Sequence, residues 1–273
     1  MSNRTDNIPA DTAVHNTKAT AWDLIGSLFW DVGRTSAKPS MAEIELFLTD
    51  IPAGAKCCVV GASTKDLVEA LVAHGAIATV LDFSERMCHD LRDALPAECC
   101  RVLQHDITRP APDGLRGTQE FVLCDRLVNR FTSAEAAAGL VGMLDLLEDG
   151  AQLRTSVKLG LYPMDERMID LGRQRGCLER FYDTTQRTID FSAAGDVLTD
   201  ALVPHGGIPT ELLLDWYRGR GQEKRFDDVD IVTLVSQARM NGRALRLLSA
   251  SDLPEAPSTR LYVAEAVGAG QGA

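Results

Sequence analysis

The sequence lacks three features that would assign it to a large class of proteins. No window is apolar enough to span a bilayer, and the N-terminal stretch MSNRTDNIPADTAVHNT has no apolar core of the signal-peptide kind. No basic stripe occurs, and the formal net charge of −11 disfavours a surface for binding polyanions. We therefore expect a cytoplasmic protein whose partners include neither nucleic acid nor a membrane.

Cysteine is present, but without the spacing of a metal or redox site. The seven cysteines include the vicinal pairs Cys57-Cys58 and Cys99-Cys100, and no C-x-x-C or Cys/His ligand spacing occurs. Neighbouring residues on a strand point to opposite faces, so neither pair is a natural disulfide. We interpret the cysteines as small buried hydrophobic residues and expect no metal. The five histidines show no mutual spacing for a metal and are interpreted as surface or loop residues: His15, His74, His89, His105 and His205.

The 273 residues can bury one large α/β core, or a core with a cap. From Lys56 onward, apolar runs typical of buried strands alternate with helical patterns, which indicates βαβ units and a parallel sheet with helices on both faces. Strands are expected at 56–60, 77–81, 101–104, 120–124 and 151–157, with helices at 64–74, 84–94 and 133–148.

Both ends of the chain depart from this rhythm. Residues 1–18 are polar and are expected to be loose until something docks them. An aromatic helical face with Trp22 and Phe29 follows, then a second helix with Ser40 as N-cap and Glu43 completing a capping box. Residues 160–225 are irregular, with helical pieces near 164–175 and 209–218. A helix at 228–242 and two strands at 244–253 and 260–267 close the chain.

The first strand runs into Gly61 and then a helix, a turn whose backbone N–H groups point at a ligand. Ala62 and Ser63 stand where nucleotide-binding turns usually carry further glycines, so an ordinary α/β turn remains an alternative. Asp82 lies 21 residues later, at the end of the second strand, where a carboxylate accepts hydrogen bonds from ribose hydroxyls. Its alternative role is to cap the next helix, which Ser84 could do instead.

The order of these elements over about 55–267 resembles a class I S-adenosylmethionine (SAM)-dependent methyltransferase. That resemblance implies a doubly wound, seven-stranded sheet with an antiparallel C-terminal hairpin. It implies an arm and helical lid at 1–54, a SAM-binding domain at 55–267 with a cap at 160–225, and a tail at 268–273. The cofactor site would comprise Gly61, Ala62, Ser63, Asp82, Phe83, Asp106, Ile107 and Asp125, with Asp106 beside the adenine amino group.

Methyl transfer from SAM to a small molecule is the default activity of such a domain. A second resemblance rests on VVGAST, VLCDRLVNRF, SVKLGLYPMDE and the aromatic N-terminal face, which look like the methyltransferase-like azetidine-2-carboxylate synthases. These enzymes cyclise SAM by attack of its α-amine on the γ-carbon and release methylthioadenosine. A third hypothesis is a non-catalytic SAM-binding domain. Of the three functions, cyclisation is the preferred prediction. A homodimer is an open alternative for the oligomeric state.

The resemblance to the azetidine-2-carboxylate synthases implies roles for three polar residues and for the two residues that replace glycines in the first turn. Asn129 and Ser192 are the candidates for holding and aiming the amine, and Tyr162 would stabilise the sulfonium through a cation–π contact. Ala62 and Ser63 would crowd the usual path of the methionine tail and force it to curl. The alternatives are core packing for Tyr162 and a surface loop laced by Asp125, Arg126 and Arg130.

Overall fold

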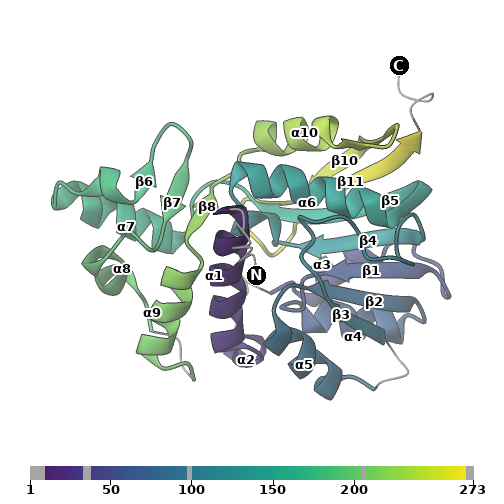
Figure 1. Ribbon diagram of the computed structural model, residues 1–273, viewed down its shortest axis with the longest axis horizontal. Coiled ribbons are helices and arrows are strands. Elements are labelled where there is room, and N and C mark those ends of the chain that lie inside the picture. The colour runs from purple at the N-terminus through teal and green to yellow at the C-terminus, as the bar shows by residue number, and fades with distance from the viewer. Residues whose placement is uncertain (1–9, 33–37, 97–99, 205–206, 269–273) are drawn as a thin grey trace, which may run out of the picture.

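A computed structural model describes residues 10–32, 38–96, 100–204 and 207–268 (Figure 1). Its main sheet has eight strands in the order β3-β2-β1-β4-β5-β11-β10-β9. The strands are β1 (Lys56–Val60), β2 (Ile77–Asp82), β3 (Cys100–Gln104), β4 (Gln119–Asp125), β5 (Leu147–Lys158), β9 (Arg239–Met240), β10 (Arg243–Asp252) and β11 (Thr259–Gly268).

The sheet confirms the predicted fold class. Strands β1 to β5 pair in parallel, whereas β11 is antiparallel to β5 and β10 is antiparallel to β11. The additional eighth strand, β9, has only two residues and pairs with β10 across a tight turn at Asn241 and Gly242. Both turn residues have a positive φ (50° and 75°), as an Asn-Gly hairpin requires. The helix expected to reach 242 therefore ends earlier, at Gln237.

Helices cover both faces of the sheet (Figure 1). One face packs against α3 (Met41–Leu48), α4 (Lys65–Ala73) and α5 (Glu85–Ala94), and the other against α6 (Ser133–Leu146) and α10 (Asp228–Gln237). Cys57 and Cys58 belong to these two opposite cores, and each is fully buried. The prediction that the vicinal cysteines are buried on opposite faces is thus confirmed for this pair, while Cys99 lies outside the described residues.

The N-terminal segment forms helices that lie against the cap. Helix α1 (Ala10–Ile25) begins inside the arm expected to be loose, and α2 (Leu28–Val32) follows it. The rings of Trp22 and Phe29 lie 5.3 and 5.6 Å from the ring of Trp216, on α9 (Thr210–Gly219). The aromatic face is therefore the surface by which α1 packs on α9, between the cap and the sheet (Figure 1).

The cap at 160–225 has a small hydrophobic core of its own. The predicted helical pieces correspond to α7 (Pro163–Gln174) and α9. Helix α8 (Asp196–Ala201) and a three-stranded sheet of β6 (Tyr182–Asp183), β7 (Thr188–Asp190) and β8 (Gln222–Lys224) were not predicted. These strands have two or three residues each, too few to show an alternating pattern in the sequence.

One predicted local motif is only half formed. The Ser40 hydroxyl caps α3 by accepting a hydrogen bond from Glu43 N. The Glu43 carboxylate, however, accepts a 2.6 Å hydrogen bond from Arg126 Nη2 on the loop after β4. Both side chains are buried, and a buried carboxylate left without a partner is strongly destabilising. Glu43 therefore pairs with Arg126, which connects α3 to the sheet, and the second hydrogen bond of the capping box is not formed. No helix among the described residues is long and apolar enough to cross a membrane.

Gly142 provides a test of how α6 packs over the end of β3. A Cβ added at Gly142 would lie 1.9 Å from the carbonyl oxygen of Ile107, and a backbone atom cannot move aside cheaply. We expect Gly142→Ala to lower the free energy of unfolding by about 2–3 kcal/mol in urea denaturation. Gly268→Ala is the control, since nothing lies within 4 Å of its added Cβ. Equal stability of the two variants would contradict the close packing of α6.

Candidate functional site

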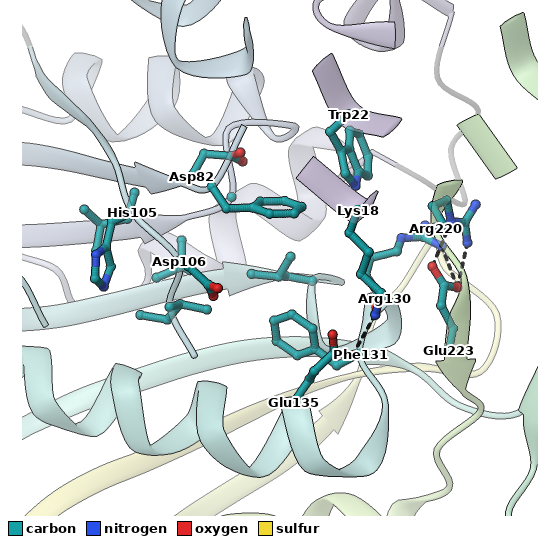
Figure 2. Close-up of a pocket in the computed structure, with 16 residues that line it drawn as sticks. Lys18, Trp22, Asp82, His105, Asp106, Arg130, Phe131, Glu135, Arg220 and Glu223 are labelled. Atoms are coloured by element: carbon teal, nitrogen blue, oxygen red, sulfur yellow. Dashed lines mark hydrogen bonds and ion pairs between the residues drawn. The ribbon is translucent and has the colours of Figure 1, made fainter. Parts of the chain in front are cut away.

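A cavity of about 540 Å³, including the part open to solvent, lies at the carboxyl ends of β1, β2 and β3. Helix α1 contributes to its wall through Lys18 and Trp22 (Figure 2). The lining residues are Lys18, Trp22, Val60, Gly61, Leu81, Asp82, Phe83, His105, Asp106, Ile107, Leu127, Arg130, Phe131, Glu135, Arg220 and Glu223. The wall therefore combines an apolar middle with charged groups at two ends (Figure 2).

The turn after β1 reaches the cavity only through Gly61. Gly61 has φ +105°, a conformation that favours glycine, and an added Cβ would meet nothing within 4 Å. The backbone of Ala62 is bonded on both sides: its N–H donates to Asp82 Oδ2 (2.7 Å), and its carbonyl accepts from Trp30 Nε1 (3.0 Å). The Ala62 side chain is buried in the hydrophobic core. Neither Ala62 nor Ser63 lines the cavity, so the structure does not place them where they would crowd a ligand tail.

Asp82 lines the cavity and holds two loops together. Its Oδ2 accepts from Ala62 N, and its Oδ1 accepts from Ser84 N at 2.8 Å. Burial raises the pKa of Asp82 to about 6, against the opposing effect of these two backbone hydrogen bonds. The Ser84 hydroxyl itself accepts from Met87 N and caps α5. Because Ser84 performs the capping, Asp82 does not serve as the N-cap of α5; it bonds the two loops and lines the cavity.

The loop after β3 contributes the next part of the wall. Asp106 Oδ1 accepts hydrogen bonds from Thr108 N (3.0 Å) and Thr108 Oγ1 (2.8 Å), so the carboxylate shapes its own loop. Ile107 is buried and Phe83 is half-buried, and both line the cavity. Five predicted cofactor residues thus meet at one cavity: Gly61, Asp82, Phe83, Asp106 and Ile107.

Asp125, also predicted for the cofactor site, is not in the cavity wall. Its Oδ1 accepts hydrogen bonds from Ser156 Oγ and from Arg126 Nη1, the latter at 2.7 Å. Arg126 in turn reaches Glu43, which makes a buried charged triad at the ends of β4 and β5. Burial raises the pKa of Glu43 although the guanidinium of Arg126 opposes it. The triad connects α3 to the ends of β4 and β5.

The three predicted catalytic residues also lie outside the cavity wall. The Asn129 amide is bonded to the backbone of one residue: its nitrogen donates to the Lys158 carbonyl (2.7 Å), and its oxygen accepts from Lys158 N (2.9 Å). The Ser192 hydroxyl donates to Asp190 Oδ1 on the exposed edge of the cap. The hydrogen bonds of both side chains are therefore made with the protein and not at the cavity wall.

The Tyr162 ring is already contacted by cations of the protein. The guanidinium carbons of Arg225 and Arg130 lie 5.2 and 5.6 Å from the ring centroid, and Lys158 Nζ lies 5.9 Å away. The hydroxyl is buried without a hydrogen-bond partner among the described residues, and burial raises the pKa of Tyr162. The cation contacts of the ring in this structure are with side chains of the protein, so the role of Tyr162 at a sulfonium stays a prediction.

The charged end of the cavity was largely missed by the sequence analysis. Lys18 Nζ donates to Glu135 Oε2 (2.6 Å) and to the Arg130 carbonyl (2.9 Å), and the ion-paired side chains are buried. Glu135 also accepts from Thr132 N and completes a capping box at the start of α6. The T-x-x-E pattern could have located this helix start, but no local signal points to Lys18, which lies 117 positions away.

Arg220 and Glu223 complete this end of the cavity. Arg220 donates twice to the Glu223 carboxylate, at 2.7 and 2.6 Å. Its guanidinium carbon lies 4.6 Å from the ring centroids of Trp216 and Tyr217. Burial acts to raise the pKa of Glu223, but Arg220 and the neighbouring arginines hold it well below its usual range. Glu223 is therefore a permanent anion and a poor base.

His105 lies on the loop after β3, which agrees with its interpretation as a surface or loop residue. The sequence analysis did not predict that it would line the cavity, and its Nε2 atom is buried without a partner among the described residues. Burial lowers the pKa of His105, which favours the neutral imidazole. Across the described part of the chain, no three His, Cys, Asp or Glu side chains form a group that could hold a metal ion.

Comparison with solved structures identifies the fold. Scans against protein-family models and against curated proteins find no match. The Burkholderia thailandensis 1,6-didemethyltoxoflavin-N1-methyltransferase is 11% identical over 97% of this chain and 93% of its own, with a TM-score of 0.57. An S-adenosylmethionine-dependent methyltransferase from Mesorhizobium loti is 13% identical over 83% and 98%, with a TM-score of 0.51. The chain thus has the class I SAM-dependent methyltransferase fold.

A much more similar structure defines the family. A Rhodobacter sphaeroides protein is 47% identical over 92% of this chain and 98% of its own, with a TM-score of 0.88, and is described as "Putative Zn-dependent Alcohol Dehydrogenases". The chain belongs to the same family as this Rhodobacter sphaeroides protein.

The Lys18–Glu135 ion pair provides a test of how α1 closes the cavity. We expect Lys18→Met to lower the free energy of unfolding by about 3–5 kcal/mol, because it leaves the buried Glu135 carboxylate unpaired. The double variant Lys18→Met/Glu135→Gln should recover part of that loss, since no buried charge is left without a partner. Arg173→Gln, on the exposed surface of α7, is the control. Urea denaturation measures all three, and an unchanged single variant would contradict a structural role for the pair.

Proposed function

We propose that the protein is a SAM-utilising enzyme that binds the nucleoside of SAM between the ends of β1, β2 and β3. The observation that carries the proposal is the meeting of Gly61, Asp82 and Asp106 at one cavity. In an open α/β sheet, ligands bind at the carboxyl ends of the strands where the strand order reverses, which here is between β1 and β4. Residues 1–54 would then act as the lid and 160–225 as the cap.

Each part of the adenosine has a suitable partner in this cavity. The Asp82 carboxylate is fixed by two backbone N–H groups and keeps lone pairs for ribose hydroxyl donors. Phe83 and Ile107 offer apolar surface for the adenine ring. Asp106 lies on the loop after β3, where it would accept from the adenine amino group. These assignments use the same residues that the sequence analysis predicted for the cofactor.

The description of the Rhodobacter sphaeroides protein names another activity, an alcohol dehydrogenase. A dinucleotide-binding Rossmann sheet continues beyond its fifth strand with a further parallel strand. In this chain the neighbour of β5 is the antiparallel strand β11, followed by the antiparallel β10. This topology favours a SAM site over a nicotinamide-dinucleotide site.

Within SAM chemistry, we propose cyclisation to azetidine-2-carboxylate. The nitrogen lone pair of the α-amine forms the bond to Cγ, the Cγ–S bond breaks, and its electrons remain on sulfur, which leaves as methylthioadenosine. The α-ammonium loses one proton to solvent before the attack, and the ring nitrogen of the product stays an ammonium. The α-amine titrates at a pKa of about 8, so a neutral fraction is available without a strong base.

The charged end of the cavity supports a reaction that needs no acceptor. Its two carboxylates, Glu135 and Glu223, are paired with Lys18 and Arg220, and neither is placed to deprotonate a second substrate. Helix α1 covers one side of this cavity through Lys18 and Trp22. Ring closure would then depend on holding nitrogen, Cγ and sulfur near a line in an enclosed site. Methyl transfer to a small molecule is the alternative, since both neighbours of this fold are named methyltransferases and one of them acts on 1,6-didemethyltoxoflavin.

Incubation of the purified protein with SAM alone separates these reactions. We expect methylthioadenosine and a four-membered imino acid, measured by mass spectrometry above the spontaneous background. Their formation should become faster as pH rises toward 8, because more of the amine is neutral. Unchanged SAM would overturn cyclisation, and S-adenosylhomocysteine on addition of a small-molecule extract would support methyl transfer. Absence of any SAM binding would remove both reactions.

Asp82 tests the nucleoside site directly. We expect Asp82→Asn to weaken SAM binding by about tenfold to a hundredfold in calorimetry, because an acceptor pair for the ribose is lost. In the wild type, affinity should be full above pH 6 and fall as pH drops below it, since protonation of Asp82 converts an acceptor into a donor. The Asn variant should lack this pH dependence. Wild-type affinity in the variant would refute the ribose contact.

A further inference from the structure

Arg130 is the cation of the cavity wall with the fewest contacts to carboxylates and carbonyls among the residues that the structure describes. It ends the short helix η1 (Val128–Arg130) after β4, and its side chain is 15% exposed. Its guanidinium has a single ion-pair contact, to Glu223 Oε2 at 3.5 Å, and donates no hydrogen bond to any residue that the structure describes. A guanidinium carries five N–H donors. Most of the hydrogen-bonding capacity of Arg130 is therefore available to a ligand.

The neighbouring cations differ from Arg130 in this respect. Lys18 donates to Glu135 and to a carbonyl, and Arg220 donates twice to Glu223. Arg225, behind the wall, donates to Asp165 and to Glu223. Glu223 is thus satisfied without Arg130.

The position of Arg130 is nevertheless held. Its guanidinium carbon lies 5.6 Å from the centroid of the Tyr162 ring, a distance compatible with a cation–π contact. Its carbonyl accepts the hydrogen bond from Lys18 on α1. Figure 2 shows Arg130 beside Lys18, Arg220 and Glu223, at the end of the cavity away from Asp82 and Asp106. A fixed cation with free donors is preorganised for an anion.

The charges that line this end do not balance. Lys18, Arg130 and Arg220 are cationic, whereas Glu135 and Glu223 are anionic, so three positive charges face two negative ones. One further negative charge would neutralise the wall. The opposite end carries two carboxylates, Asp82 and Asp106, which suit hydroxyl and amino donors. The cavity as a whole fits a ligand with a nucleoside at one end and an anion at the other.

We propose that Arg130 binds the carboxylate of the methionine part of SAM. This assignment rests on the proposed function and deepens it. A carboxylate matches the fork of a guanidinium and forms two parallel hydrogen bonds with it. Such a contact would hold the amino-acid tail at the charged end of the cavity, across the apolar middle from the nucleoside. An acceptor carboxylate in methyl transfer would present the same chemistry, so the test uses SAM without an acceptor.

The test compares two ligands that share the nucleoside. Methylthioadenosine retains the adenosine of SAM and lacks its amino-acid part. We expect Arg130→Gln to weaken SAM binding by about ten- to a hundredfold in calorimetry, with methylthioadenosine binding unchanged. Arg130→Lys should lie between the wild type and Gln, since a lysine keeps the charge without the fork. Arg218→Gln, an exposed arginine of α9, is the matched control.

Each outcome has a distinct meaning. Unchanged SAM affinity in Arg130→Gln, with intact methylthioadenosine binding, would overturn the assignment and leave the SAM site in place. Equal weakening of both ligands would also overturn it, because a lost carboxylate contact cannot affect a ligand without a carboxylate. Failure of the wild-type protein to bind either ligand would refute the proposed function itself.

Discussion

The reversal of strand order between β1 and β4 is the constraint on which the rest of this structure depends. The chain proceeds from β1 to β2 and β3 on one side, then crosses to β4 and β5 on the other. Right-handed crossovers consequently place α4 and α5 on one face and α6 on the opposite face. The loops after β1 and β4 diverge, and the space between them must be filled by a ligand or by other parts of the chain. Helix α1 and the cap provide the covering wall.

That covering wall is held by charge pairs as well as by aromatic packing. Trp22 of α1 and Phe29 of α2 pack against Trp216 of the cap, whereas Lys18 of α1 donates to Glu135 on α6. Each buried ion must find a partner, because an unpaired one would cost several kcal/mol. The ion pair of Lys18 with Glu135 therefore both closes the cavity with α1 and neutralises a buried charge in its wall. Among the described cations of the cavity wall, Lys18 and Arg220 donate hydrogen bonds to carboxylates, whereas Arg130 has one ion-pair contact of 3.5 Å.

The sequence predicted the parts of the molecule that depend on local pattern. All five parallel strands and the positions of Asp82 and Asp106 follow from apolar runs and their carboxyl ends. The short strands β6, β7 and β8 leave no periodic signal, and the overlong helix at 228–242 missed the Asn-Gly turn. The pair of Lys18 with Glu135 joins residues 117 positions apart, so only the folded chain reveals it. The residues predicted to aim the amine and stabilise the sulfonium were chosen for their side-chain chemistry, and in the structure their contacts are with the protein: Asn129, Ser192 and Tyr162.

The missing glycines of the first turn acquire a different meaning in the structure. The methyl group of Ala62 is buried in the hydrophobic core, and its backbone is bonded to Asp82 and Trp30, so alanine in place of a glycine does not narrow the cavity. The positions of Ala62 and Ser63 therefore give no support to crowding at the turn as the cause of a curled SAM tail. The cationic side chains of the cavity lie at the opposite wall, with Arg130 and its neighbours. If SAM binds as proposed, with adenosine at Asp82 and its carboxylate at Arg130, the separation of these two groups determines whether its tail is extended or curled.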